Sequence, residues 1–420
     1  MKIRLAHLAN RIEELDPRAL VLTLNALALI IFFFVALRYN YLHADNIGRL
    51  MFSTPDTWKY RAIADWLSGK TSTFSPSLVL PFLYPLFLGS VWQITGNPYV
   101  FWAVQFCLWI AAINLTATAA YRFTKRNMMM AIAFCIMMMN LSAIVLTFYA
   151  LPEIVVIFLW SVFLYLLSGT NLRDPEPRYA FWLTFLLSLL AITKPVFQLH
   201  LALLVTYVFY RSIRRYKTIL LVVLALSPVA LQIGVNANLY GVVGISNLSE
   251  ATAKWYILSQ VYAARNTISL QDARNAVKDY DSIRIAGYLI QDPASSLSAY
   301  LRNLGENLTS ASDSLEFYPK PYVFTRWTNI GYLVVQIIFL PVIVYIFFAK
   351  TSPLALAIKL MYLFSSLTVF TSAISFNEGD RLVLSALPLW ISIYAWAPVL
   401  FLNPPNANGT VTFKLRPSIN

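Results

Sequence analysis

The sequence predicts an all-α polytopic membrane protein, and three observations lead to this class. Of the 420 residues, 59% are hydrophobic and 12% are charged, whereas about 25% of an ordinary soluble domain is charged. Uncharged stretches such as 19–37 and 99–121 reach the ~20 residues that a helix needs to cross ~30 Å of hydrocarbon. Lysine and arginine, finally, are distributed very unevenly among the segments that connect such stretches.

Ten apolar segments are expected to span the bilayer, at 19–37, 99–121, 128–148, 154–169, 179–193, 195–210, 218–235, 330–348, 353–376 and 382–402. The connections on one side hold 16 Lys and Arg in 62 residues, against 15 in about 166 on the other. Because cytoplasmic loops are enriched in these residues, the dense side and both termini are predicted to be cytoplasmic. The net charge of +13 reflects this topology and contact with anionic lipid, and no basic stripe indicates a nucleic-acid partner.

The chain divides into three parts by the position of its two large outer loops. Residues 1–235 are expected to form a catalytic membrane module that includes the first outer loop, 38–98. An outer, helical loop follows at 236–329, and 330–420 contains the last transmembrane helices. The short apolar segment 78–92, with two prolines, is expected to be an outer juxtamembrane helix, so the fold is about ten transmembrane helices plus such outer helices.

Short helices in these outer loops are indicated by capping residues. Thr54 followed by Pro55 is typical of a helix start. Ser269 and Asp272 have the spacing of a capping box. Asp292-Pro293 separates two further helices.

Acidic residues indicate where the chemistry lies. Of the 19 Asp and Glu, 14 fall on the predicted outer side and none at the centre of a predicted span. A proton- or ion-coupled transporter would be expected to carry carboxylates at the bilayer midplane. The pattern instead favours a site at the boundary between membrane and periplasm, where Asp56 and Glu153 lie closest to the ends of spans.

Cysteine and histidine give no indication of a metal centre. Cys107 and Cys135 lie inside predicted spans and are expected to be buried apolar side chains without a disulfide. The three histidines are scattered, which disfavours a zinc site. His200 is expected to bond to a neighbouring helix.

Five short motifs, in this order along about 330 residues, resemble those of the GT-C glycosyltransferases, the group that contains aminoarabinose transferase and protein mannosyltransferases. They are Pro55-Asp56-x-x-Lys59-Tyr60 in the first outer loop, Pro81-x-x-Tyr84-Pro85, Pro152-Glu153, Thr193-Lys194-Pro195 and Gly379-Asp380-Arg381. The chain departs from the family at Thr57, where a second carboxylate is common, at Lys59, a common Arg, and at Leu80, a Lys in the aminoarabinose branch. It lacks the large soluble C-terminal domain of some relatives.

The resemblance implies transfer of a sugar from a polyprenyl phosphate to an acceptor hydroxyl of a glycan, lipid or protein, with inversion. The site would face the periplasm or exterior of the cell membrane. Asp56 would act as the base and Glu153 as a second catalytic acid residue. The donor phosphate would be bound by Lys59, Lys194 and Arg381, and the substrate by Trp58, Tyr60, Tyr84 and Asp380.

No cofactor is implied, and a divalent metal is not supported because Thr57 replaces the second carboxylate. The residues at the outer ends of spans, Asp56, Glu153, Lys194 and Arg381, are expected to converge around one cavity. Two alternatives stay open. One is an O-antigen polymerase or ligase-type enzyme, and the other is a flippase or transporter of lipid-linked saccharides.

Overall fold

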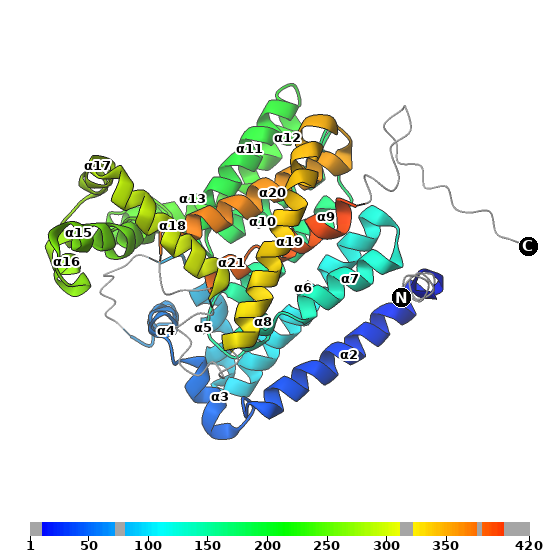
Figure 1. Cartoon of the computed structure of the whole chain (residues 1–420), viewed down its shortest axis with the longest axis horizontal. Coiled ribbons are helices and arrows are strands. Elements are labelled where there is room, and N and C mark those ends of the chain that lie inside the picture. Colours follow the sequence, from blue (N-terminus) through cyan, green and yellow to red (C-terminus); the bar gives the residue numbers. More distant parts are fainter. Residues whose placement is uncertain (1–10, 72–79, 311–321, 376–379, 399–420) are drawn as a thin grey trace, which may run out of the picture.

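The computed structural model describes residues 11–71, 80–310, 322–375 and 380–398. Within these ranges the regular secondary structure is helical throughout, and no strand occurs (Figure 1). Four helices are long and apolar enough to cross a membrane: α2 (Pro17–Arg38), α6 (Pro98–Thr124), the Asn329–Ala349 part of α19 (Tyr322–Ala349), and α20 (Pro353–Ser372). The chain is therefore a helical protein of the membrane-embedded type.

Shorter apolar helices account for the other predicted spans. They are α7 (Asn127–Met138), α9 (Glu153–Leu167), α10 (Pro177–Ala191), α11 (Gln198–Ser212) and α22 (Leu387–Trp396). Helices α12 (Tyr216–Ala225) and α13 (Ser227–Tyr240) meet at 43°, and together they are long enough for a fifth span. Every predicted span thus contains helix, whereas the predicted number of ten stays a prediction.

Three predicted spans are interrupted, and the interruptions lie next to the candidate site. The first breaks at Asn140, whose side chain accepts from Ala143 N at 2.8 Å and starts α8 (Leu141–Leu146). The second begins with a 3₁₀ turn, η1 (Pro195–Phe197), ahead of α11. The third is divided into α21 (Asp380–Leu384) and α22. Breaks of this kind turn side chains at helix ends toward the interior instead of along a continuous helix surface.

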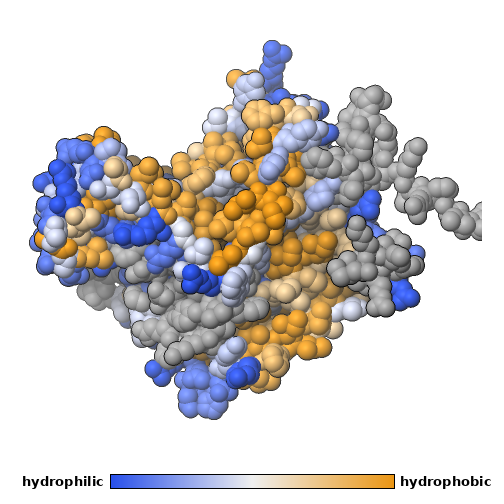
Figure 2. All heavy atoms as spheres, viewed as in Figure 1, coloured by the Kyte–Doolittle hydropathy of each residue, from blue (hydrophilic) through white to orange (hydrophobic). Residues whose placement is uncertain are grey.

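The core of the bundle is built around α9. Its apolar residues are nearly all buried, and so are Trp109 of α6, Trp160 of α9 and Trp396 of α22. The surface of the bundle is itself hydrophobic: Figure 2 shows hydrophobic residues over the middle of one face and hydrophilic ones over α15–α17 and at its edges. An apolar surface between polar ends is what a bilayer requires.

Two groups of short helices lie outside the bundle. The first contains α3 (Ala44–Met51), α4 (Pro55–Leu67) and α5 (Leu83–Thr95). The second contains α14 (Leu248–Thr252), the π-helix η2 (Ala253–Leu258), α15 (Ser259–Asn266), α16 (Leu270–Val277), α17 (Ser282–Gln291) and α18 (Pro293–Thr309). Helices α15–α17 extend to the left of the bundle in Figure 1, and small clusters such as Ile257, Val261 and Ala299 hold this group together.

The predicted caps of these helices are confirmed. The Thr54 side chain accepts from Thr57 N at 3.3 Å at the start of α4. Ser269 accepts from Asp272 N at 3.1 Å and donates to the Asp272 carboxylate at 2.6 Å. Asp292 accepts from Ser295 N at 3.1 Å and starts α18.

The cysteines and His200 give one correction and one confirmation. Both thiols are free, but Cys107 is exposed on α6 and Cys135 is half-buried. The prediction of two buried cysteines is therefore wrong for Cys107, because this side chain lies on the outer surface of α6. His200 bonds to the neighbouring helix as expected, with Nε2 2.8 Å from Phe364 O and 3.1 Å from Thr368 Oγ1 on α20.

Candidate functional site

Arg381 joins the acidic residues of two motifs that are far apart in the sequence. Its Nη2 donates to Asp56 Oδ2 at 3.0 Å, across 325 positions of sequence. Its Nε donates to Glu153 Oε1 at 2.7 Å, and Lys194 Nζ donates to the same oxygen at 2.9 Å. Lys59 Nζ completes the group with a bond of 3.2 Å to Asp56 Oδ1. The expected convergence of the four outer-end residues is confirmed, and we call these five side chains the ionic cluster.

Each member of the ionic cluster stands at a helix end or a turn. Asp56 and Lys59 lie in the first turns of α4, Glu153 begins α9, Lys194 precedes η1, and Arg381 belongs to α21. Acidic residues at the starts of α4 and α9 are favoured by the positive end of the helix dipole. Part of the arrangement therefore follows from local helix chemistry before any ligand is considered.

Backbone contacts between loops hold these ends in position. Ala150 N donates to Met51 O at 3.0 Å and ties the turn before α9 to the end of α3. Gln105, fully buried on α6, donates to Thr147 O at 3.2 Å and Tyr149 O at 2.6 Å. On the other side, Asp380 N donates to Ser310 O at 2.9 Å and fixes the start of α21.

Burial divides the ionic cluster into an inner and an outer half. The side chains of Glu153 and Arg381 are 0% and 5% exposed, whereas those of Asp56 and Lys59 are 35% and 46% exposed. A buried ion pair is costly to break, because one charge would be left without a partner in a medium of low polarity. The inner half is thus suited to hold the site together, and the outer half can be reached by a ligand.

The charges of the ionic cluster do not cancel, since three cations face two carboxylates. Burial acts to raise the pKa of Asp56, but the charges of Arg381 and Lys59 outweigh it and hold this pKa below the ordinary 3.8. Asp56 is therefore ionised at neutral pH, with each of its oxygens bonded to a cation. The excess of positive charge makes the cluster attractive to an anion such as a phosphate.

The predicted aromatic residues differ in how they relate to the ionic cluster. Tyr84 of α5 is fully buried, with its ring edge-on to Tyr60 of α4 at 4.9 Å. Burial and then the charge of Glu153 raise the pKa of Tyr84, which places its hydroxyl in the field of the cluster. Trp58 is 55% exposed, and its ring contacts are with Phe52 and the guanidinium of Arg61. We do not observe Trp58 against the cluster.

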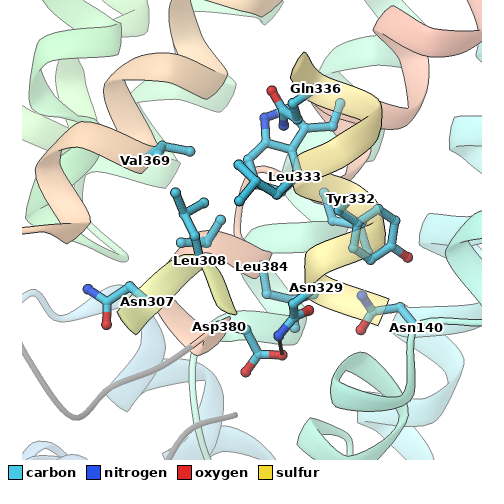
Figure 3. Close-up of a pocket in the computed structure, with 13 residues that line it drawn as sticks. Asn140, Asn307, Leu308, Asn329, Tyr332, Leu333, Gln336, Val369, Asp380 and Leu384 are labelled. Atoms are coloured by element: carbon cyan, nitrogen blue, oxygen red, sulfur yellow. Dashed lines mark hydrogen bonds between the residues drawn. The ribbon is translucent and has the colours of Figure 1, made fainter. Parts of the chain in front are cut away.

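Asp380 lies next to Arg381 but faces a separate cavity of about 120 Å³ (Figure 3). Its Oδ2 accepts from Ser142 Oγ at 2.5 Å and from Asn329 Nδ2 at 3.1 Å. Asn140, Asn307, Tyr332 and Gln336 also line the cavity, as do Leu308, Leu333, Val369, Val383, Leu384, Leu387 and Trp390. We call this space the amide cavity. Glu378 and Gly379 of the last motif lie outside the described residues.

The sequence did not indicate the carboxamides of this cavity. Asn140 begins a short helix, Asn307 lies on α18 and Asn329 and Gln336 lie on α19, so no motif connects them. A single amide within a long apolar stretch was the available signal, because a polar group in a membrane helix is costly unless it has a partner. Within the described residues, no group of three His, Cys, Asp or Glu side chains could hold a metal ion.

No protein-family model, curated protein or solved structure matches this chain. The inference of function therefore rests on the geometry of the ionic cluster and of the amide cavity, together with the order of the motifs.

Proposed function

We propose that the protein is an integral membrane glycosyltransferase of the GT-C type, which moves a sugar from a polyprenyl-phosphate donor to an acceptor hydroxyl on the outer side of the cell membrane. One observation carries the proposal. Residues from four of the five motifs that resemble the family, at positions 56, 59, 153, 194 and 381, form one ionic cluster. Residues that merely stabilised separate helices would have no reason to meet at one place.

The reaction is a single displacement at the anomeric carbon. The acceptor oxygen attacks this carbon, the bond from the carbon to the phosphate oxygen breaks, and the electron pair stays on the phosphate. Attack from the face opposite the phosphate inverts the anomeric centre. The hydroxyl proton passes to the carboxylate of Asp56, a step that contributes about 10²–10⁴-fold to such rates. Charge that develops on the phosphate is stabilised by Arg381, Lys59 and Lys194.

Donor binding has a second effect, because Asp56 is a weak base while both its oxygens accept from cations. A phosphate that draws Lys59 and Arg381 toward itself removes part of the charge that lowers the Asp56 pKa. The carboxylate then becomes more basic when the donor is in place. Glu153, fully buried against Arg381 and Lys194, keeps these two cations in position during the exchange.

A structural role is the main competing explanation, since the same ion pairs also connect α4, α9 and α21. The exposure of Asp56 and Lys59 argues against a purely structural role, because exposed ion pairs contribute only about 0–1 kcal/mol to stability. Two carboxylates and three cations leave one positive charge, which a structural network does not require and an anionic substrate would balance.

Mass spectrometry of membrane glycolipids and surface glycans, with and without the gene, tests the proposal. We expect loss of the gene to remove one sugar from an acceptor and to leave the polyprenyl-phosphate sugar in excess. Purified protein in lipid nanodiscs should then form the same product from that donor. If the protein moved the lipid-linked sugar across the bilayer without breaking its bond to phosphate, the transporter alternative would replace the proposal.

A further inference from the structure

The amide cavity combines groups of two kinds. Six of its lining residues are polar, namely Asn140, Asn307, Asn329, Gln336, Tyr332 and Asp380, and the other seven are aliphatic or aromatic. No lysine or arginine is among them. Carboxamides, a carboxylate and a phenol both donate and accept hydrogen bonds, so such a lining suits a ligand with hydroxyl groups. An anion would meet the charge of Asp380 with no cation from the lining to balance it.

Hydrogen-bonding capacity is left over in this lining. Asn307 is fully buried, and its Nδ2 donates to Ser372 O at 2.9 Å and Ser375 O at 3.0 Å. Its Oδ1 has no partner within the described part of the chain. A buried acceptor without a partner is costly, and a ligand hydroxyl or an ordered water would satisfy it.

The position of the amide cavity relates it to the ionic cluster. Asp380 and Arg381 are consecutive in α21, so their Cα atoms are about 3.8 Å apart, yet Asp380 lines the cavity while Arg381 bonds to Asp56 and Glu153. In a polyprenyl-phosphate sugar, one oxygen atom separates the phosphorus from the anomeric carbon. A phosphate held at Arg381 therefore brings the attached sugar to within a few bond lengths of Asp380.

From these three observations we infer that the amide cavity binds the sugar ring of the donor, and that this sugar is an uncharged monosaccharide. The inference rests on the proposed function and specifies its substrate class. A volume of about 120 Å³ corresponds to about four waters at ~30 Å³ each, which limits the occupant to one ring. Asp380 and the amides accept and donate to ring hydroxyls, and the leucines, valines and Trp390 cover the C–H face.

Uronic acids are disfavoured by the same groups. Their carboxylate would lie beside Asp380, and two like charges in a site of low polarity repel strongly. A hydrocarbon chain is the other occupant that the apolar lining could hold. It would make no use of Asp380, Asn329 or Asn140, which together form the polar rim of the cavity in Figure 3.

Binding of three soluble donor analogues to the full chain in nanodiscs tests the inference: farnesyl phosphate, farnesyl phosphate linked to a neutral hexose, and the same compound with a hexuronate. We expect the hexose analogue to bind at least about 10-fold more tightly than farnesyl phosphate, and the hexuronate no more tightly than it. Asp380→Asn and Gln336→Leu should each weaken binding of the hexose analogue by about 10-fold and leave farnesyl phosphate unchanged. Gln271→Leu, the same change at an exposed position of α16, is the control.

The outcomes separate the two hypotheses. Equal weakening of all three analogues by the cavity variants would show that the cavity holds the hydrocarbon chain and would overturn the inference. So would unaltered discrimination between the hexose analogue and farnesyl phosphate in both cavity variants. If wild-type protein bound none of the analogues, or if Lys59→Ala left the affinity for farnesyl phosphate unchanged, the proposed phosphate site would fail, and the inference with it.

Discussion

Arg381 is the residue on which the candidate site depends most. Its guanidinium donates from Nε to Glu153 at 2.7 Å and from Nη2 to Asp56 at 3.0 Å. The planar fork of arginine allows two carboxylates to be held at a fixed angle, which the single ammonium of lysine cannot reproduce. Because Asp56 and Glu153 come from different helices, this geometry fixes α4 relative to α9 and α21.

Removal of the Arg381 guanidinium should be strongly destabilising. In Arg381→Ala, the fully buried Glu153 keeps Lys194 alone as a charged partner, and breaking a buried ion pair typically costs about 3–5 kcal/mol. Denaturation of the protein in detergent would measure this loss. Arg302→Ala, at an exposed position of α18, should change stability by no more than about 0.5 kcal/mol. A loss of similar size in both variants would contradict the role given to Arg381.

Asp56→Asn tests the base directly, because it keeps the size of the side chain and removes the proton acceptor. Sugar transfer should fall by about 10²–10⁴-fold, with donor binding retained. The control is Asp65→Asn on the same helix, where Asp65 pairs with Arg61 and accepts from Gln93. Asn is also accepted near helix starts, so near-normal transfer by a well-folded Asp56→Asn protein would leave Asp56 with a helix-start role alone.

The pH dependence of stability should reveal the pairing of Asp56 with its two cations. Its folded pKa is depressed below 3.8, so the stability that it contributes is fully present above that value and is lost as the pH falls through the folded pKa. The difference in unfolding midpoint between wild type and Asp56→Asn should therefore be constant from pH 7 to about pH 5 and shrink below about pH 4. A difference that grew on acidification would mean that the pKa is raised.

At the scale of elements, the close packing of α4 against α5 brings Tyr60 and Tyr84 together beside the ionic cluster. Gly89 of α5 makes this approach possible: a Cβ atom there would lie 3.2 Å from Ala64 Cβ of α4. Gln93 of α5 then donates to Asp65 at 3.1 Å and to Ser68 at 2.6 Å on α4. The pair of helices is thus a platform whose spacing depends on one small residue.

Gly89→Leu should separate the two helices. Overfilling a tightly packed contact costs about 1–3 kcal/mol, and we expect transfer to fall as well because α4 carries Asp56. Gly287→Leu on α17 is the matched change where no atom lies within 4 Å of the added Cβ. Thermal unfolding together with a transfer assay would measure both effects. If Gly89→Leu retained full activity, the spacing of α4 and α5 would not matter to the site.

The elements also show what can be predicted from sequence and what cannot. Helix starts at Thr54, Ser269 and Asp292 were predictable because capping is a local property of a few residues. The break at Asn140 and the 43° bend between α12 and α13 were not, since both lie within continuous apolar stretches. Long-range packing decides where such a helix breaks, and apolar periodicity contains no record of it.

For the whole molecule, the membrane limits how the chain can be arranged, and this explains why part of the site could be predicted. Assignment of charged motifs to one side of the bilayer was sufficient to expect Asp56 and Arg381 near each other. Sidedness does not specify which carboxylate pairs with which cation, and it gave no indication of the amide cavity. Asn307 and Asn329 meet there because α18 and α19 pack against each other at a place that no short motif marks.

Membrane topology is the prediction on which the others depend, because a polyprenyl-phosphate donor on the outer leaflet requires the ionic cluster to face outward. After replacement of Cys107 and Cys135 by Ala, single cysteines at the exposed positions Ser68 of α4 and Lys217 of α12 can be probed with a membrane-impermeant maleimide. We expect Ser68→Cys to react in intact cells and Lys217→Cys to react only after permeabilisation, since Arg211, Arg214, Arg215 and Lys217 belong to the basic, cytoplasmic side. The reverse pattern would place the ionic cluster on the cytoplasmic side, where soluble nucleotide sugars are available, and would remove the reason for a lipid-linked donor.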